Sequence, residues 1–314
     1  MARGQQRENV CNRRLNLIQI EQETTVIQCR RLAYAALTTG RMDELVRYYE
    51  DIIGLFLSHR DEDRAILSTR QGLECIVLEH GERPELRCLS FEISPRTSLE
   101  EAQAALGKAG VPAEIKKGRS PSLPRVLALK DPNDTEIELF NSITFVAADT
   151  RERGINALKL GHVAYFLPAI EEVTDFYVNK LGFKKSDWRE GRSMFLRCSP
   201  DHHTINFFKG EKKLAHLAFE VKDFPELVRA SDLLVRNNFP LDWGPARHTI
   251  GHNCACYHRN PDGVRTELYA EMDQMKDEEL GYFDPKPWHE DRPQRPRNWV
   301  RENSPRNKWI PGVP

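Results

Sequence analysis

The feature that most constrains this chain is an internal repeat. Residues 31–55 read RLAYAALTTGRMDELVRYYEDIIGL and residues 159–183 read KLGHVAYFLPAIEEVTDFYVNKLGF. Each stretch predicts a short apolar strand, then a helix whose apolar residues recur at helical spacing, then a helix end at a glycine, Gly54 or Gly182. A repeat of this length predicts two copies of one structural unit rather than a single irregular domain.

The downstream halves of the two copies also match. CLSFEI (88–93) corresponds to HLAFEV (216–221), and the turn and strand at 129–140 correspond to those at 258–269. A helix is expected after each apolar strand, at 97–110, where Ser98 and Glu101 form a capping box, and at 225–239. Within each module the two halves also resemble each other, so one small unit could occur four times.

We therefore predict an α+β fold of two tandem modules, at 31–147 and 155–275. Each module is expected to pair two βαβββ units into an open β-barrel with its helices outside. Residues 1–30 would form an N-terminal extension, and residues 276–314, rich in Pro, Arg and Trp, an irregular tail.

Duplication makes the first module an internal control for the second. The register holds to within one residue, because 162 minus 34 and 216 minus 88 both give 128, and 267 minus 138 gives 129. The polar positions to compare are Tyr34 with His162, Cys88 with His216, and Glu138 with Glu267. Each of these histidines taken alone is more often a hydrogen-bonded core residue than a ligand. Only the second module has two histidines and a carboxylate together, which suits a non-haem Fe(II) site with open positions, or zinc with a water ligand.

Other ionisable residues gather in the second half of the chain, which has eight histidines after residue 160 against two before it. Histidines near neutral pH are suited to proton transfer. For His202, His252 and His258 we expect a surface or supporting role, whereas His203 and His248 are candidates for chemistry, together with Tyr257.

The pattern resembles the type I extradiol ring-cleaving dioxygenases of the vicinal oxygen chelate (glyoxalase) superfamily. The resemblance covers about residues 31–275 and is stronger in the second module. In that family an active-site histidine, a tyrosine, an Asn/Asp-Pro-x-Gly turn and a ligand glutamate follow one another, as His248, Tyr257, NPDG (260–263) and Glu267 do here. The string DHHT resembles the family segment whose second histidine, here His203, is the acid–base residue.

The resemblance implies that His162, His216 and Glu267 hold Fe(II), or Mn(II) as in some relatives. Its substrates would be a small aromatic ortho-diol and O2, and the ring would open beside the two hydroxyls in an aromatic degradation pathway. It also implies a homo-oligomer, with a tetramer as the expected assembly, in the cytoplasm.

The same resemblance gives His203 the transfer of a proton, and His248 and Tyr257 the stabilisation of the bound hydroxylate. Arg247, Trp188 and Arg292 are candidate contacts for the substrate's side chain, because some relatives grip a carboxylate with tail arginines. The arginine-rich tail could equally pack against another subunit. A substituted or trihydroxylated ring remains open as the substrate.

Composition excludes several other classes. The net charge of −1 gives no field for nucleic acid or an anionic membrane, and no apolar run is long enough to cross a bilayer. The polar N-terminus shows no secretory signal, and seven scattered cysteines favour reduced thiols. Two alternatives remain: a metal-dependent lyase, isomerase or hydrolase that consumes no O2, and a non-catalytic binding protein of the same superfamily.

Overall fold

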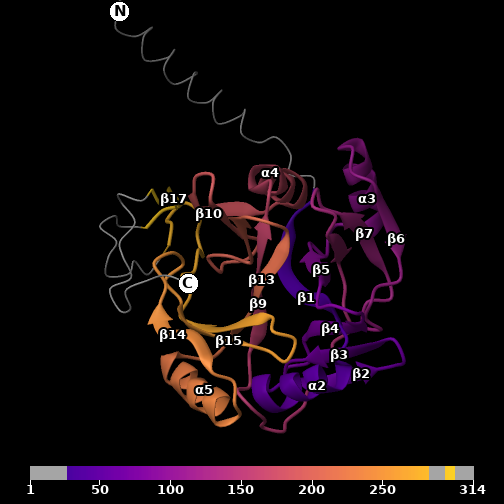
Figure 1. Ribbon diagram of the computed structural model, residues 1–314. Coiled ribbons are helices and arrows are strands. Elements are labelled where there is room, and N and C mark those ends of the chain that lie inside the picture. The colour runs from indigo at the N-terminus through magenta and orange to yellow at the C-terminus, as the bar shows by residue number, and fades with distance from the viewer. Residues whose placement is uncertain (1–26, 283–293, 301–314) are drawn as a thin grey trace, which may run out of the picture.

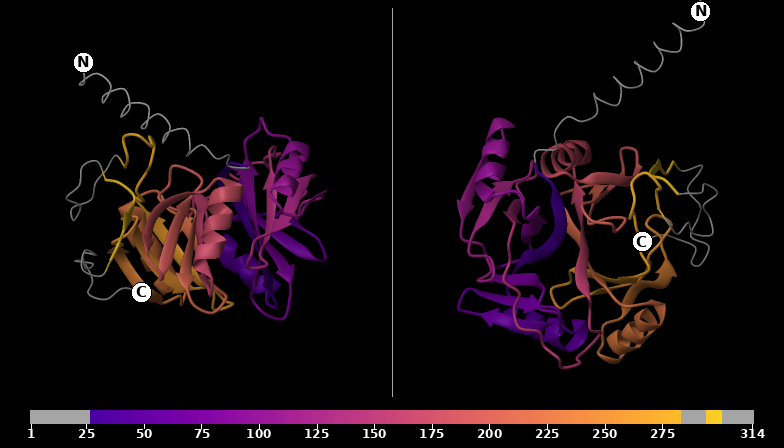
Figure 2. Two further views of the ribbon diagram at one scale, coloured as in Figure 1. Left: turned by 90° about the horizontal axis from the view of Figure 1, so that it is seen from above. Right: turned by 180° about the vertical axis from the view of Figure 1, so that it is seen from behind.

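The two modules form two mixed β-sheets that lie side by side (Figures 1 and 2). The structure is a computed structural model that describes residues 27–282 and 294–300. Within that part of the chain, the first module contributes eight strands and the second contributes eight, joined by a ninth from the tail. The observed fold is the α+β fold of two tandem modules that the repeat predicts.

The first sheet has the strand order β2-β3-β4-β1-β5-β8-β7-β6. Its strands are β1 (Cys29–Thr39), β2 (Phe56–Arg60), β3 (Arg64–Ser68), β4 (Glu74–His80), β5 (Leu86–Ile93), β6 (Ala113–Lys116), β7 (Val126–Lys130) and β8 (Glu136–Phe140). The second sheet has the order β14-β15-β16-β13-β9-β12-β11-β10-β17. Its strands are β9 (Lys159–Leu167), β10 (Lys184–Arg189), β11 (Ser193–Arg197), β12 (Ile205–Lys209), β13 (Lys213–Glu220), β14 (Leu241–Arg247), β15 (Cys254–Arg259), β16 (Arg265–Ala270) and β17 (Arg297–Asn298).

Strand pairing is the same in both sheets. The central strand β1 runs antiparallel to β5 and parallel to β4, and β5 runs parallel to β8. In the second sheet β9, β13, β12 and β16 repeat these relations. Side chains alternate between the faces of a strand, so the shared register places equivalent positions of the two modules on equivalent faces.

Each βαβββ unit packs its helix against its own strands. The helices are α2 (Met42–Arg47), which continues as the π-helix η1 (Tyr48–Ile53), α3 (Leu99–Lys108), α4 (Ile170–Leu181) and α5 (Phe224–Arg236). Gly54 and Gly182 end the first and third of these with left-handed φ values of 85° and 75°, which glycine adopts without strain. Ser98 and Glu101 form the expected capping box at the start of α3.

The first helix differs from the regular helix that its spacing predicts, because its last six residues form the wider π-helix. The wider turn buries both Tyr48 and Tyr49, whereas α4 buries Tyr177 and leaves Phe176 half-buried. Tyr48 can therefore reach the second module, where its hydroxyl lies 2.7 Å from Nε2 of His258 in β15.

Two structural elements cross the predicted module limits. Strand β1 begins at Cys29, before the expected end of the extension, and the Ile27 amide bonds to the Lys180 carbonyl of α4. Part of the expected irregular tail joins the second sheet, since β17 pairs parallel with β10. The limits 31–147 and 155–275 thus remain our proposal for the two repeated units.

One large apolar cluster spans both modules, and β1 contacts β9 where the sheets meet. A smaller cluster fills the inner face of the first sheet with Tyr34, Ile66, Val77 and Phe140 among its members. The inner face of the second sheet instead lines a cavity. None of the helices in the described ranges is long and apolar enough to span a membrane.

Candidate metal centre and active site

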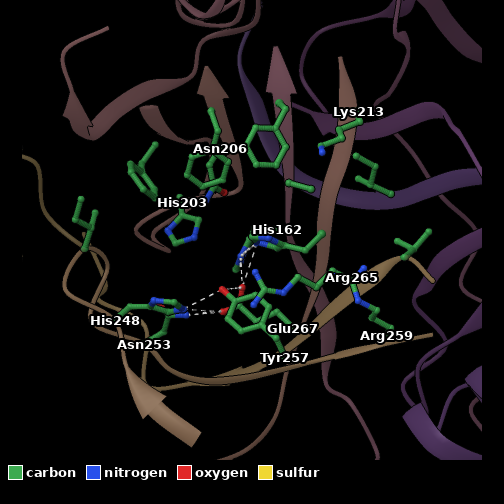
Figure 3. Close-up of a pocket in the computed structure, with 18 of the residues that line it drawn as sticks. His162, His203, Asn206, Lys213, His248, Asn253, Tyr257, Arg259, Arg265 and Glu267 are labelled. Carbon is green, nitrogen blue, oxygen red and sulfur yellow. Dashed lines mark hydrogen bonds and ion pairs between the residues drawn. The ribbon is translucent and has the colours of Figure 1, made fainter. Parts of the chain in front are cut away.

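Three buried side chains converge on the inner face of the second sheet. His162 lies on β9, His216 on β13 and Glu267 on β16, which are neighbouring strands. Nε2 of His162 lies 3.1 Å from Oε2 of Glu267, Nε2 of His216 lies 3.2 Å from the same oxygen, and the two nitrogens are 3.3 Å apart (Figure 3). This is the one group of ligand-type side chains found close enough to hold a metal ion among the residues that the structure describes.

The donor set fits a divalent metal. Nitrogen and carboxylate ligands bind transition metals at about 2.0–2.2 Å, so donors at adjacent corners of an octahedron lie about 3 Å apart. The three observed separations of 3.1–3.3 Å match that spacing. Three donors on one face leave the opposite face open to other ligands, which is the arrangement of the 2-His-1-carboxylate sites.

The charge state of the three side chains also suits a cation. The two histidines hold the pKa of Glu267 well below its usual range despite its burial, so the carboxylate is ionised. Burial lowers the pKa of His216, which keeps the imidazole neutral and its lone pair available. A metal ion needs ligands in these deprotonated forms.

Two further side chains hold Glu267 in place. The Tyr257 hydroxyl on β15 donates to Oε2 over 2.7 Å, and the Asn253 amide donates to Oε1 over 2.7 Å. Nε2 of His248 lies 2.9 Å from the Tyr257 hydroxyl, and the His248 ring stacks on Trp243. Burial lowers the pKa of His248 to about 4, so the imidazole is neutral at pH 7. Burial, reinforced by the Glu267 carboxylate, raises the pKa of Tyr257, so the phenol keeps its proton.

His203 lies beside the triad, with its ring centroid 4.3 Å from that of His162. Its Nδ1 is 3.0 Å from Nδ1 of His202, whose Nε2 is 3.1 Å from the Asp187 carboxylate. Burial is the main cause that lowers the pKa of His203 well below its usual value, so it is also neutral. The structure therefore gathers the histidine and tyrosine candidates for proton transfer around the three candidate ligands.

The equivalent place in the first module carries no comparable donor set. There the Tyr34 hydroxyl donates directly to Glu138, and the Arg119 guanidinium pairs with the same carboxylate at 2.7 Å. Cys88 lies in the apolar cluster beside Tyr34, and burial raises the pKa of its thiol. A hydrogen bond and an ion pair thus satisfy Glu138, where the second module has two histidines facing Glu267.

A cavity of about 630 Å³ opens over the triad, within the size range of small-molecule sites. Figure 3 shows His203 and His248 on one side of the triad and Arg259 and Arg265 on the other. Apolar side chains, among them Phe166, Phe195, Phe208, Leu214 and Ile250, complete the wall together with Pro84 of the first module.

Two of the three candidate side-chain contacts lie outside the cavity wall. The cavity wall does not include Arg247, whose guanidinium donates to the His252 carbonyl at 2.6 Å and pairs with Glu271. Trp188 is also outside the wall, and its carbonyl accepts the Trp299 amide on the tail. Arg292 lies outside the described residues.

The cavity contains cations that the sequence interpretation missed. Four cationic side chains line it, those of Arg189, Lys213, Arg259 and Arg265. Apart from Glu267, the lining contains one carboxylate, that of Asp262. Strand alternation could have found two of them, because Arg259 and Arg265 lie two residues from Tyr257 and Glu267 on the same strands. The two arginines also pair across the ladder, as Tyr257 and Glu267 do.

Asn206 was missed as well, although the duplication contains a signal for it. In the ladders Asn206 pairs with Ala164 and Phe195, and Val77 pairs with Ala36 and Ile66. Asn206 and Val77 therefore occupy equivalent positions, and only the copy that lines the cavity is polar. Asn253 lies in a loop for which the repeat offers no such comparison.

Similarity to known proteins agrees with this geometry. The Glyoxalase/Bleomycin resistance protein/Dioxygenase superfamily profile matches residues 159–268, which contain the triad. Metapyrocatechase 2 of Cupriavidus necator is 29% identical over 120 residues, 37% of this chain, and the match spans only 38% of that protein. Metapyrocatechase of Pseudomonas sp. (strain CF600) is 22% identical over 262 residues, covering 76% of this chain and 85% of that one.

The fold has a solved counterpart in the anaerobic substrate complex of homoprotocatechuate 2,3-dioxygenase from Brevibacterium fuscum. The two structures match with a TM-score of 0.77 at 22% identity, over 92% of this chain and 91% of that one. Fold and site define a two-module metalloprotein of the glyoxalase type. Within that class, the chain is similar over most of its length to proteins named metapyrocatechase and homoprotocatechuate 2,3-dioxygenase.

Proposed function

We propose that this protein is an Fe(II)-dependent dioxygenase that opens the ring of a substituted catechol beside its two hydroxyls. The observation that carries the proposal is the grouping of His203, His248 and Tyr257 around the three candidate ligands. A metal-dependent lyase or isomerase needs the ligands but not this group of proton-transfer residues next to them.

A bound metal would hold the diol and O2 together and conduct electrons from one to the other. His162, His216 and Glu267 would bind it, and Asn253 and Tyr257 fix the Glu267 carboxylate. Fixed ligands of this kind keep the reacting groups in register, which is a large part of the rate enhancement in such sites.

The residues around the triad have separate roles in the proposal. Neutral His203 accepts a proton from the substrate hydroxyl and returns it to the oxygen released during ring opening. When substrate binds, the His248 N–H and the Tyr257 O–H turn from their present partners, Tyr257 and Glu267, and donate to the substrate oxygen that carries negative charge. The apolar wall around them keeps water away, which strengthens these electrostatic contacts.

The cationic side of the cavity favours a substrate with an anionic substituent. The Arg265 guanidinium lies over the Tyr257 ring at 4.1 Å, and Nζ of Lys213 lies over Phe166 at 5.1 Å. Arg259 is held by Asp242 at 3.2 Å. A carboxylate on the catechol's side chain would meet Arg265 and Lys213 while the two hydroxyls face the triad.

The test is O2 consumption by anaerobically purified protein loaded with Fe(II). The panel comprises catechol, alkylcatechols, a trihydroxylated ring and catechols with a side-chain carboxylate. We expect one O2 per substrate and a coloured ring-fission product, with the redox-inert Zn(II)-loaded protein as the control. Turnover without O2 uptake would favour the lyase or isomerase, and tight binding without turnover would favour a binding protein. Parallel loading with Mn(II) decides the preferred metal.

Lys213→Gln tests the substrate class. Loss of one charge-assisted contact costs about 1.5–3 kcal/mol, so KM for the carboxylated catechol should rise about 10- to 100-fold while KM for catechol stays constant. Lys212→Gln is the matched control, since Lys212 is adjacent and does not line the cavity. Equal effects on charged and uncharged substrates would reject the anionic class. Cytoplasmic localisation and a homotetramer belong to the same proposal and rest on the family resemblance.

A further inference from the structure

Three buried side chains form a row that leads from the cavity into the protein. His203 lines the cavity, and its Nδ1 lies 3.0 Å from Nδ1 of His202. Nε2 of His202 lies 3.1 Å from Oδ2 of Asp187 on β10. The exposed fractions of Asp187, His202 and His203 are 1%, 0% and 3%, so water does not compete for these contacts.

The tail segment fixes the Asp187 end of the row. The Trp299 indole donates to Oδ2 over 2.8 Å, and the Arg297 backbone amide donates to Oδ1 over 2.9 Å. Two N–H donors thus face this carboxylate, which accepts hydrogen bonds from both. The remaining lone pairs of the Asp187 carboxylate are best satisfied by another N–H donor. Nε2 of His202, which faces this carboxylate, therefore carries the proton of that ring.

That proton determines the rest of the row. A neutral imidazole has one N–H and one lone pair, so Nδ1 of His202 is an acceptor. The hydrogen on the short contact between the two rings must then come from Nδ1 of His203. Nε2 of His203, the nitrogen left for the cavity, therefore presents a lone pair.

We propose that Asp187 and His202 are positioning residues that keep His203 in the tautomer able to accept the substrate's proton. The inference rests on the acid–base role of His203 in the proposed function. When His203 takes the proton on Nε2, it becomes an imidazolium whose Nδ1–H still points to His202, and the Asp187 carboxylate stabilises the charge through that ring. The proton leaves again to the product, so the row returns to its starting state.

The surrounding packing supports a fixed geometry. A Cβ added at Gly251 would lie 3.2 Å from Nδ1 of His202 and 3.2 Å from Cε1 of His203, so this glycine closely covers the contact between the rings. The other side of His202 stacks on Tyr282 with an interplanar angle of 26°. Gly251 thus packs against both imidazoles, and Tyr282 packs against that of His202.

Two substitutions of His202 separate a tautomer-setting role from simple packing. His202→Asn places an amide oxygen near the former Nδ1 position, where it accepts from His203, but it leaves part of the ring's volume empty. His202→Phe keeps the ring volume against Tyr282 and removes the acceptor. We expect His202→Phe to lower kcat about 100-fold with little change in KM. The kcat of His202→Asn should stay within about tenfold of that of the parent enzyme.

The measurement is steady-state O2 uptake by the Fe(II)-loaded full chain, with bound iron and substrate dissociation constants determined for each variant. A packing role predicts the reverse order, with Phe more active than Asn, and this order would overturn the inference, as would equal kcat for both variants and the parent. Failure of the parent enzyme to consume O2 with any catechol would instead reject the proposed function. Asp187→Asn should lower kcat as His202→Phe does. One of the N–H groups that donate to the Asp187 carboxylate would then face an amide N–H instead of an oxygen.

Discussion

Acidification should weaken the contact between the two modules at one histidine. His258 is fully buried, and Nε2 of its ring lies at hydrogen-bond distance, 2.7 Å, from the Tyr48 hydroxyl oxygen. Burial lowers the pKa of His258 to about 3, from an ordinary value near 6.5. The unfolded chain therefore binds a proton at His258 between these two pH values, and the folded chain does not.

The sign and size of the effect follow from proton linkage. A histidine with a lowered pKa in the folded state contributes stability above pH 6.5 that is lost as the pH falls toward 3. With pKa values of about 6.5 and 3 for the two states, the loss attributable to His258 between pH 7 and pH 5 is about 2 kcal/mol. Other buried histidines act in the same direction, so only a comparison with a variant isolates this one.

The variant is His258→Gln, whose amide can still bond to Tyr48 but does not titrate. Urea unfolding of both proteins at pH 7.5, 6.5, 5.5 and 5.0 gives the difference in free energy of unfolding at each pH. We expect this difference to shift in favour of the glutamine protein by about 2 kcal/mol between pH 7 and pH 5.

Tyr48→Phe is the matched control. It removes the hydrogen bond at a cost of about 1 kcal/mol but leaves His258 buried, so its stability should fall with pH as steeply as that of the parent. Parallel pH curves for the parent and His258→Gln would refute the assigned cause. A flattened curve for Tyr48→Phe would show that the hydrogen bond, and not burial, lowers the pKa.

Two further predictions concern the paired carboxylates. Mn(II) at 100 times its dissociation constant should stabilise the protein by about 2.7 kcal/mol in thermal unfolding. Glu267→Gln should abolish this increment. Glu138→Gln, the equivalent change in the first module, should retain it. Arg119→Met should destabilise the first module by about 3–5 kcal/mol, because it strands the buried Glu138 carboxylate, and adding Glu138→Gln should recover most of that loss in chemical denaturation. An unchanged Mn(II) increment in Glu267→Gln, or a double variant as unstable as Arg119→Met, would contradict the respective reasoning.

The repeat allowed the fold to be predicted because it constrained every element twice. An apolar strand and a helix with a glycine end could each be misread alone, but their recurrence at a constant offset fixed both type and order. The π-helical end of the first helix escaped prediction, since Tyr48 and Tyr49 fit the apolar stripe of an ordinary helix equally well. In the fold this segment contacts the second module through Tyr48 and His258, a long-range contact that the local sequence does not encode.

Site residues were predictable where the two copies could be compared at one ladder position. His162 and His216 emerged in this way, and the same comparison applied to Val77 would have found Asn206. Asp187 gave no such signal, because a charged residue within KKSDWR reads as part of a solvated strand. Only the fold shows that the tail covers it and makes it a hydrogen-bond acceptor for His202.

The two inner faces explain why the chain keeps a module without the donor set. A sheet is stable when its inner face is filled, as Tyr34, Ile66, Val77 and Phe140 fill that of the first module. The second module leaves the same face hollow and lines it with polar groups, which sacrifices dispersion contacts and buries charge. The apolar cluster that spans both modules offsets this cost by packing the outer side of the hollow sheet against its filled copy. The first module thus adds apolar packing to the sheet that holds the open, polar cavity.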